Sequence, residues 1–229
     1  MKAMILAAGR GERLRPLTDT TPKPLIQAGP KRLIEYLIER LVQAGFDDLV
    51  INYAHLGEQF PQVLGDGQRY GARISYSPEC DGGLETAGGI INALPLLGNE
   101  PFLVVNGDIW TDFDFAGLAD FKLADDKLCH LVLVDNPPHN PDGDFVLDEA
   151  GNVSNGNGEK ATFSGIGIYR PAMFAGLSND KRPLKPLFNH AIVRHQMSGQ
   201  LYHGRWSDIG TVERLEALEA ELLADQKFQ

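Results

Sequence analysis

Glycines and positive charges are concentrated in residues 6–25, near the start of the chain. Gly9 and Gly11 follow a short apolar run, and four cations accompany them: Arg10, Arg13, Arg15 and Lys23. Glycine lets the backbone turn sharply and approach a ligand closely, and successive free N–H groups form a concavity that binds anions. Arginine and lysine supply the charge opposite to that of phosphate. The segment therefore predicts a phosphate-binding loop, with a simple tight turn as the alternative.

The spacing of this segment argues against two familiar phosphate motifs. A P-loop would need a glycine, four further residues and then Gly-Lys-Ser or Gly-Lys-Thr, which the segment lacks. A dinucleotide fingerprint would need a third glycine at position 14, where Leu14 stands, and an acidic residue at the end of the second strand. Asn52 and Tyr53 occupy that place instead. An NAD-dependent oxidoreductase is therefore disfavoured.

Composition and charge restrict the class of partner. The 229 residues are 43% hydrophobic and 23% charged, which is typical of a globular protein, and their formal net charge is −10. A nucleic-acid partner would need a basic face and is not expected, although local cations can still neutralise one nucleotide. No apolar run approaches the roughly 20 residues that span a bilayer, and the first residues do not resemble a signal peptide. We expect a cytoplasmic protein without a membrane partner.

The hydrophobic pattern predicts the elements that must position the loop. Short apolar runs predict strands, and apolar residues at every third or fourth position predict helices. The expected strands cover 2–8, 49–53, 73–77, 102–105, 128–134, 145–147, 165–169 and 201–203. The expected helices cover 33–41, 86–94, 115–124, 186–194 and 211–223, with Pro95 ending the second of them. This alternation predicts an α/β fold in one domain, 1–229: a mostly parallel, doubly wound (Rossmann-like) sheet with helices on both faces.

The composition changes after residue 134. Residues 136–143 are rich in Pro, Asn, Asp and His, and residues 151–159 are rich in Gly and Asn, with the short strand 145–147 between them. Such turn-forming residues around one short strand predict a small hairpin and loop insertion over the active site rather than a second domain.

Two aspartates lie close to ends of predicted strands or helices, where a ligand can bind. Ligands of open parallel sheets bind beyond the carboxyl ends of the strands, and Asp108 comes directly after the strand 102–105. Asp208 lies in the segment 206–211, just before the last helix. Each aspartate considered alone could instead cap a helix.

The segment 6–25 matches the signature L-A-A-G-x-G-x-R-L-x-P-L-T-x-x-x-P-K-P-L of the sugar-1-phosphate nucleotidyltransferases, which this chain resembles. Further elements of that family follow in order: the base-side segment 81–88, the turn Asn106-Gly107-Asp108, the pair Glu159-Lys160, the strand 165–169 and the segment 206–211. The family joins a nucleoside triphosphate to a sugar 1-phosphate and releases pyrophosphate. Little side-chain chemistry is required, because positioning and charge neutralisation supply the catalysis.

The resemblance implies a role for particular residues of this chain. It assigns the nucleotide to Gly11, Glu12, Arg13, Lys23 and Gly83. It assigns the cofactor Mg²⁺ to Asp108 and Asp208, and catalysis to Arg13, Lys23 and Asp108. It assigns the sugar 1-phosphate to Asn106, Gly143, Glu159, Lys160 and Gly165.

Two departures from the family pattern leave the sugar open. Gly143-Asp144-Phe145 stands where many members have Tyr-Gly-Val, and Ala161 replaces the proline after Glu159-Lys160. A uridylyltransferase acting on a cell-wall sugar is favoured, with a guanylyltransferase for mannose 1-phosphate or a thymidylyl- or uridylyltransferase for glucose 1-phosphate as alternatives. A non-catalytic nucleotide-sugar sensor is disfavoured, because the loop cations and both aspartates are present. The sequence leaves the oligomeric state open.

Overall fold

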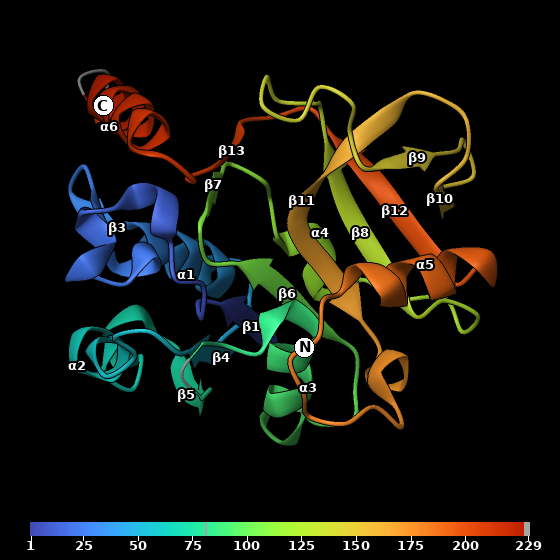
Figure 1. The fold of residues 1–229 in the computed structure, drawn as a ribbon, viewed down its shortest axis with the longest axis horizontal. Helices are drawn as coiled ribbons and strands as arrows, with labels where there is room; N and C mark the ends of the chain where they lie inside the picture. Colours follow the sequence, from blue (N-terminus) through green and yellow to red (C-terminus); the bar gives the residue numbers. More distant parts are fainter. Residues whose placement is uncertain (81, 227–229) are drawn as a thin grey trace.

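The computed structural model describes residues 1–80 and 82–226, which are built around a mixed sheet (Figure 1). The main strands lie in the order β12–β8–β11–β6–β1–β4–β5. They are β1 (Ala3–Leu6), β4 (Asp48–Tyr53), β5 (Arg73–Pro78), β6 (Phe102–Asn106), β8 (Cys129–Val134), β11 (Lys160–Tyr169) and β12 (Met197–Tyr202). Of these strands, β11 runs antiparallel to both of its neighbours, and the remaining pairings are parallel. The predicted mostly parallel α/β sheet is confirmed.

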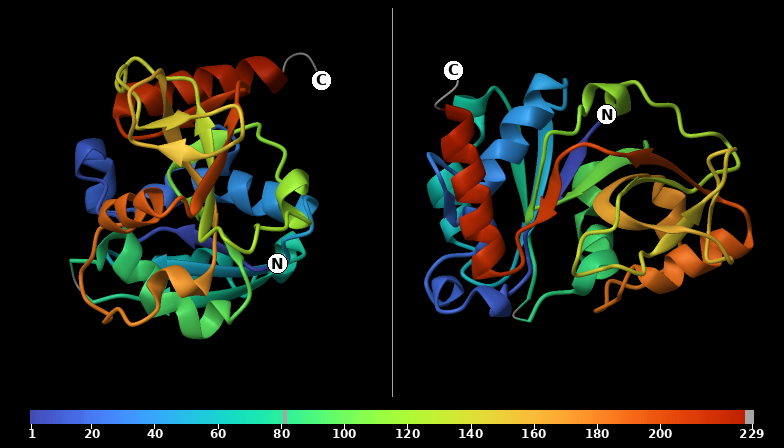
Figure 2. Two further views of the ribbon diagram at one scale, coloured as in Figure 1. Left: turned by 90° about the vertical axis from the view of Figure 1, so that its right-hand side faces the viewer. Right: turned by 90° about the horizontal axis from the view of Figure 1, so that it is seen from above.

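Helices cover both faces of this sheet, and each face has its own core (Figure 2). The helices are α1 (Leu33–Gln43), α2 (Gln59–Leu64), α3 (Glu85–Leu97), α4 (Ala116–Ala119), α5 (Lys185–Val193) and α6 (Val212–Gln226). On β1, Ile5 packs toward the core that contains α1, and Met4 packs toward the core that contains α3 and α5. Successive side chains of a strand point to opposite faces, so the continuous apolar runs read from the sequence are strands buried on both sides.

A third core packs the signature loop, the segment 6–25, against the last helix, α6. Leu14 and Ile26 of the loop region pack with Ile209 and with three leucines of α6: Leu215, Leu218 and Leu222. Burying one leucine contributes about 1.5–3 kcal/mol, so the last helix contributes to holding the loop. Residues about 200 positions apart in the chain thus meet beside the site.

Some predicted boundaries were wrong. The helix expected at 115–124 is only one turn, α4, because the chain turns away at Asp120, and Phe121 packs against the His130 ring at 4.3 Å between centroids. Pro95 lies inside α3 and does not end it; the helix ends at Leu97, before Gly98 with φ of 90°. The strand expected at 165–169 is the second half of β11, which bends at a bulge between Phe163 and Ile166.

Several short elements were not predicted, and two of them matter for the site. β7 (Ile109–Thr111) pairs antiparallel with β13 (Trp206–Asp208), while β2 (Gln27–Ala28) pairs with β3 (Lys31–Arg32). The expected insertion is present as the hairpin of β9 (Phe145–Leu147) and β10 (Val153–Ser154), which pairs with the start of β11. Within the described residues, no helix is both long and apolar enough to cross a membrane.

Candidate active site

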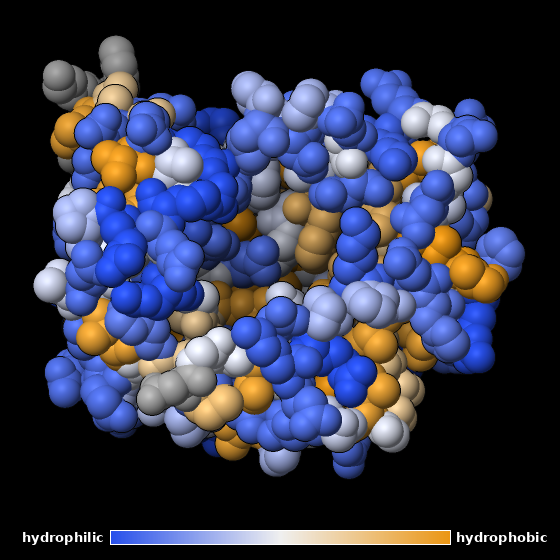
Figure 3. All heavy atoms as spheres, viewed as in Figure 1, coloured by the Kyte–Doolittle hydropathy of each residue, from blue (hydrophilic) through white to orange (hydrophobic). Residues whose placement is uncertain are grey.

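Three adjoining cavities lie at the carboxyl ends of β1 and β6. The central cavity, about 330 Å³, lies between residues 6–10 and 82–86. It shares Gly9, Lys23 and Asp108 with a loop cavity of about 350 Å³ that contains Gly11, Glu12, Arg13 and Gly210. It shares Glu85, Thr86 and Asn106 with a wider α5 cavity of about 810 Å³, bordered by the β9–β10 hairpin and α5. Figure 3 shows the hollow in the middle of this face, with hydrophilic residues around its rim.

The loop cavity is shaped by Gly11. This residue has φ of 67°, and a Cβ added to it would lie 2.9 Å from Cγ2 of Thr18, so glycine is required both by conformation and by space. Its carbonyl accepts hydrogen bonds from the Leu14 amide and the Thr18 hydroxyl, each at 2.9 Å. Glu12 and Arg13 follow in a short 3-10 helix, η1 (Glu12–Leu14), with exposed side chains. The glycine thus turns the chain so that Arg13 can face the cavity it lines.

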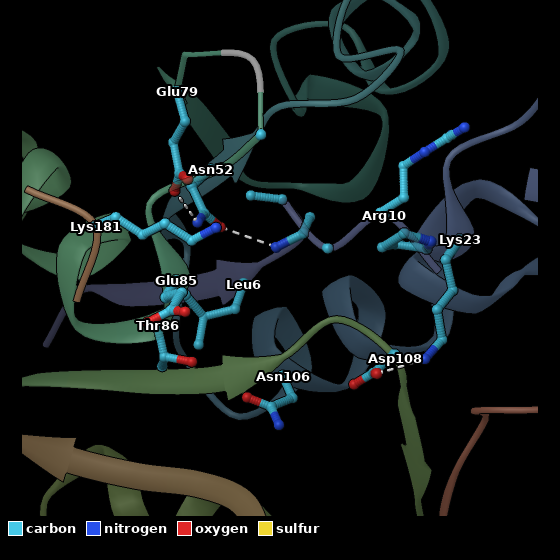
Figure 4. Close-up of a pocket in the computed structure, with 16 residues that line it drawn as sticks. Leu6, Arg10, Lys23, Asn52, Glu79, Glu85, Thr86, Asn106, Asp108 and Lys181 are labelled. Atoms are coloured by element: carbon cyan, nitrogen blue, oxygen red, sulfur yellow. Dashed lines mark hydrogen bonds and ion pairs between the residues drawn. The ribbon is translucent and has the colours of Figure 1, made fainter. Parts of the chain in front are cut away.

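Lys23 and Asp108 form an ion pair between the loop and the end of β6 (Figure 4). The Lys23 Nζ lies 2.5 Å from the Asp108 Oδ2, and Lys23 is only 8% exposed. Pro22 and Pro24 flank the lysine and restrict its backbone. Asp108 is held in turn by Gly107, whose amide donates to the Leu6 carbonyl at 2.8 Å. The structure therefore brings Lys23 and Asp108, two of the three residues predicted to be catalytic, into contact.

Asp208 reaches the same place through the β7–β13 ladder. Asp208 pairs with Ile109 in that ladder, and the Ile209 amide donates to the Asp108 carbonyl at 2.7 Å. The backbones of the two aspartates, 100 positions apart in the chain, are thus neighbours. The Asp208 carboxylate has other partners than Lys23: Oδ1 lies 2.5 Å from Arg214 Nη1 and 2.7 Å from His139 Nε2.

The two aspartates fit a hard divalent cation such as Mg²⁺. Mg²⁺ is usually bound by one or two carboxylates, while water and substrate phosphates provide its other ligands. In the described ranges, no group of three or more His, Cys, Asp or Glu side chains is arranged to hold a metal. A donor set of two carboxylates therefore suits a cation that is shared with a bound phosphate rather than enclosed by the protein.

The far end of the central cavity is organised by two residues that the sequence did not single out. Asn52 is 2% exposed; its Oδ1 accepts from the Ala7 amide at 2.8 Å, and its Nδ2 donates to Glu79 at 2.6 Å. Glu79 also accepts from the Leu84 amide at 2.6 Å. This network ties the start of the signature loop to the segment that carries Gly83, whose φ is 67°. Asp81 of the predicted base-side segment lies outside the described residues.

Lys181 also enters the central cavity, from a segment that crosses the start of α3 (Figure 4). The Arg182 amide donates to the Leu84 carbonyl at 2.9 Å, and the Arg182 carbonyl accepts from the amides of Ala87 and Gly88 at 3.0 and 3.2 Å. These contacts cap the first turn of α3 and fix the neighbouring lysine. No local signal marks Lys181 in the sequence, because it lies in an irregular polar stretch.

The five residues predicted to bind the sugar do not all lie at the α5 cavity. Asn106, Gly143 and Lys160 line the α5 cavity. Gly165 lies under Asn106 at the bulge of β11, and an added Cβ would come 2.5 Å from Asn106 Nδ2. Glu159 is exposed and lies outside the residues that line the cavity. The structure thus brings four of the five predicted residues together and leaves Glu159 at the rim of the hairpin.

Comparison with known proteins identifies the class. The model of the nucleotidyl transferase family matches residues 2–225, so the chain belongs to this family. It is 55% identical over 231 residues to the N-acetylmuramate alpha-1-phosphate uridylyltransferase of Neisseria meningitidis, with 98% of each chain covered. The protein of that name from Caulobacter vibrioides is 32% identical, with 96% of each covered. The predicted sugar-1-phosphate nucleotidyltransferase, acting on a nucleoside triphosphate and a sugar 1-phosphate, is confirmed.

More distant relatives act on other bases or share only the fold. The mannose-1-phosphate guanylyltransferase catalytic subunit beta of Drosophila melanogaster is 31% identical over 91% of this chain and 59% of its own length. The crystal structure of a putative glucose-1-phosphate thymidylyltransferase from Bacillus anthracis has a TM-score of 0.83 and 22% identity, with 96% of this chain and 94% of that chain covered. At this identity the structural likeness supports the fold alone.

Proposed function

We propose that this enzyme transfers a uridylyl group from UTP to N-acetylmuramate 1-phosphate, giving the nucleotide-sugar and pyrophosphate in cell-wall recycling. The observation that carries the proposal is the 55% identity, over 98% of both chains, to the uridylyltransferase of that substrate. The presence of both aspartates and of the loop cations supports an active enzyme. Because UTP is an intracellular metabolite, we also place the enzyme in the cytoplasm.

The proposed reaction is an in-line displacement that the chain assists by positioning. A phosphate oxygen of the sugar 1-phosphate forms a bond to the α-phosphorus of UTP, and the bond from that phosphorus to the bridging oxygen of pyrophosphate breaks. The leaving pyrophosphate takes the electron pair. Gly11, Arg13 and Lys23 are assigned to the phosphates because they line the loop cavity. Fixed donors and cations aimed at the charge that develops there lower the barrier without reorganisation.

Asp108 and Asp208 are assigned to Mg²⁺. A bound Mg²⁺ supplies neutralisation of charge on the phosphate oxygens. Lys23 and Asp108 both line the loop cavity, so the Lys23 ammonium group can contact either the carboxylate or a bound phosphate. Arg214 and His139 hold the Asp208 side chain in a fixed direction.

The two remaining cavities are assigned to the base and the sugar. Gly83 and the loop it belongs to, held by Asn52 and Glu79, face the base in the central cavity. Asn106, Gly143 and Lys160 face the sugar 1-phosphate in the α5 cavity, with Gly165 supporting Asn106 and Glu159 at the rim. Main-chain contacts at Gly83 select a base by shape and hydrogen bonding.

A substrate matrix tests this function. The purified protein is assayed with Mg²⁺, each of four nucleoside triphosphates and the 1-phosphates of N-acetylmuramate, N-acetylglucosamine, glucose and mannose, and pyrophosphate release is measured. We expect the highest kcat/KM with UTP and N-acetylmuramate 1-phosphate. A higher value with GTP and mannose 1-phosphate, or with another pair, would overturn the substrate assignment. Absence of pyrophosphate release with every pair would overturn the proposal that the protein is an active enzyme.

A further inference from the structure

The α5 cavity carries two positive charges where a sugar phosphate needs only one. Lys160 enters it from the first residue of β11, and Lys185 enters it from the first residue of α5. Ion pairs in the described part of the chain engage other lysines: Lys2, Lys23, Lys31 and Lys127. Lys160 is half-buried and Lys185 is exposed, and both side chains are available to a ligand.

The acidic residues of the cavity do not account for these lysines. Asp144 uses Oδ2 to accept from the Phe163 amide at 2.9 Å, which ties its carboxylate to β11. Glu85 lies where the α5 cavity joins the central cavity, since it lines both. The cavity thus holds as many carboxylates as lysines, but within the described residues neither carboxylate forms an ion pair with Lys160 or Lys185.

Lys185 also stands at a position that does not favour a lysine in a helix. The amino end of a helix carries partial positive charge, so a cation in the first turn is unfavourable and an anion is favourable. Pro186, the next residue, fixes the helical backbone but has no N–H to offer a ligand. The lysine side chain and the helix end together favour a negatively charged group beside α5.

The other walls of the cavity suit an acylated sugar with an apolar substituent. Phe188 of α5 meets Phe145 and Phe163 edge to face, with ring centroids 5.8 and 5.6 Å apart. Asn155 of the hairpin donates to Asn189 of α5 at 2.9 Å, which joins the two sides of the cavity. Aromatic rings accommodate methyl groups, and the two amides are able to meet hydroxyl or acetamido groups.

We propose that Lys185 selects the sugar by binding the carboxylate of its lactyl group. This inference rests on the proposed function, because N-acetylmuramate 1-phosphate carries two anions: the phosphate and the lactyl carboxylate. Lys160, on β11, binds the phosphate, and Lys185, on α5, binds the carboxylate. N-acetylglucosamine 1-phosphate lacks the lactyl group and so leaves Lys185 without a partner.

The test compares these two sugars in three variants. Lys185→Gln removes the charge, Lys185→Arg keeps it, and Arg194→Gln removes one exposed positive charge from the other end of α5 as a matched control. For each protein, kcat/KM is measured with UTP and either N-acetylmuramate or N-acetylglucosamine 1-phosphate. Thermal unfolding checks that each variant is folded.

We expect Lys185→Gln to lower kcat/KM for N-acetylmuramate 1-phosphate roughly 10- to 100-fold, the range expected for a charged hydrogen bond, mainly through KM. The value for N-acetylglucosamine 1-phosphate should stay unchanged, Lys185→Arg should restore most of the preference, and Arg194→Gln should leave both values unchanged. An equal loss with both sugars, or an unaltered preference, would overturn the role of Lys185 and leave the proposed function standing. Failure of the wild-type protein to use N-acetylmuramate 1-phosphate would overturn both.

Discussion

The loop end and the α5 end of the site are built in different ways. At the loop end, Lys23 is buried, paired with Asp108 at 2.5 Å and flanked by prolines, and Gly11 fits closely against the side chains of Thr18 and Lys23. At the α5 end, Lys160 and Lys185 extend into a wider cavity, and within the described residues neither forms an ion pair. The first arrangement suits a reaction step that is common to a family, and the second can change with the sugar. The comparison separates chemistry from substrate choice within one cleft.

The largest effect is expected at Asp108. Asp108→Asn removes a carboxylate assigned to Mg²⁺, and we expect kcat to fall by about 10²- to 10³-fold or more, with either sugar. Circular dichroism should show an unchanged fold. Asp114→Asn is the control, because Asp114 accepts from the Ala116 amide at the start of α4 and asparagine caps helices equally well. Near-normal turnover of Asp108→Asn would remove Asp108 from the reaction.

Lys23→Ala should have the next largest effect. It removes a cation from the phosphates and leaves Asp108 without its partner, so we expect kcat/KM to fall by roughly 10²-fold for both substrates. Lys31→Ala, which breaks a surface ion pair with Glu39 and a cation–π contact with Tyr36, should keep nearly normal kinetics because both contacts lie away from the cavities. If Lys23→Ala altered only the preference between sugars, it would be wrong to assign the reaction step to the loop end and the choice of sugar to the α5 end.

A smaller effect, on stability, is expected at Gly11. Alanine there would have to adopt a positive φ and meet Thr18 at 2.9 Å, so Gly11→Ala should lower the free energy of unfolding by about 1–3 kcal/mol. Gly9 has no atom within 4 Å of an added Cβ, so Gly9→Ala should change the unfolding free energy little. Denaturant unfolding of both variants measures the difference. Equal losses would show that the loop does not need the conformation of Gly11.

The smallest expected effect is on the pH dependence of folding stability, through His130 in the half of the sheet that carries the α5 cavity. Burial lowers the pKa of His130 below its ordinary 6.5, against a hydrogen bond with Gln200 that raises it. The unfolded chain therefore takes up a proton more readily, and stability is lost as the pH falls from about 6.5 toward the lowered pKa. His130→Gln should reduce the drop in melting temperature between pH 7.5 and 5.5. His190→Gln, at an exposed position of α5, should leave that drop unchanged.

The loop segment itself was largely predictable from the sequence because its geometry is local, whereas its contacts with Asp108 and α6 depend on the fold. Gly11 and Lys23 stand 12 positions apart in one segment, and the strand before Asp108 is a continuous apolar run. The α5 end was not predictable to the same extent, because α5, which carries Lys185, meets Asn155 and Phe145 of the hairpin region only through the fold. Asn52 and Glu79 were missed for a similar reason: their hydrogen bond joins β4 to the loop that follows β5. The helix at 115–124 was overpredicted because tertiary packing of Phe121 ended it early.

We propose that the loop end performs a metal-dependent nucleotidyl transfer onto the sugar held at the α5 end. The most direct measurement is pyrophosphate release from UTP and N-acetylmuramate 1-phosphate by the wild-type protein, before and after chelation and after addition of Mg²⁺. We predict release that chelation abolishes and Mg²⁺ restores, with formation of an equal amount of nucleotide-sugar. No release in the presence of Mg²⁺, or undiminished release after chelation, would contradict the claim.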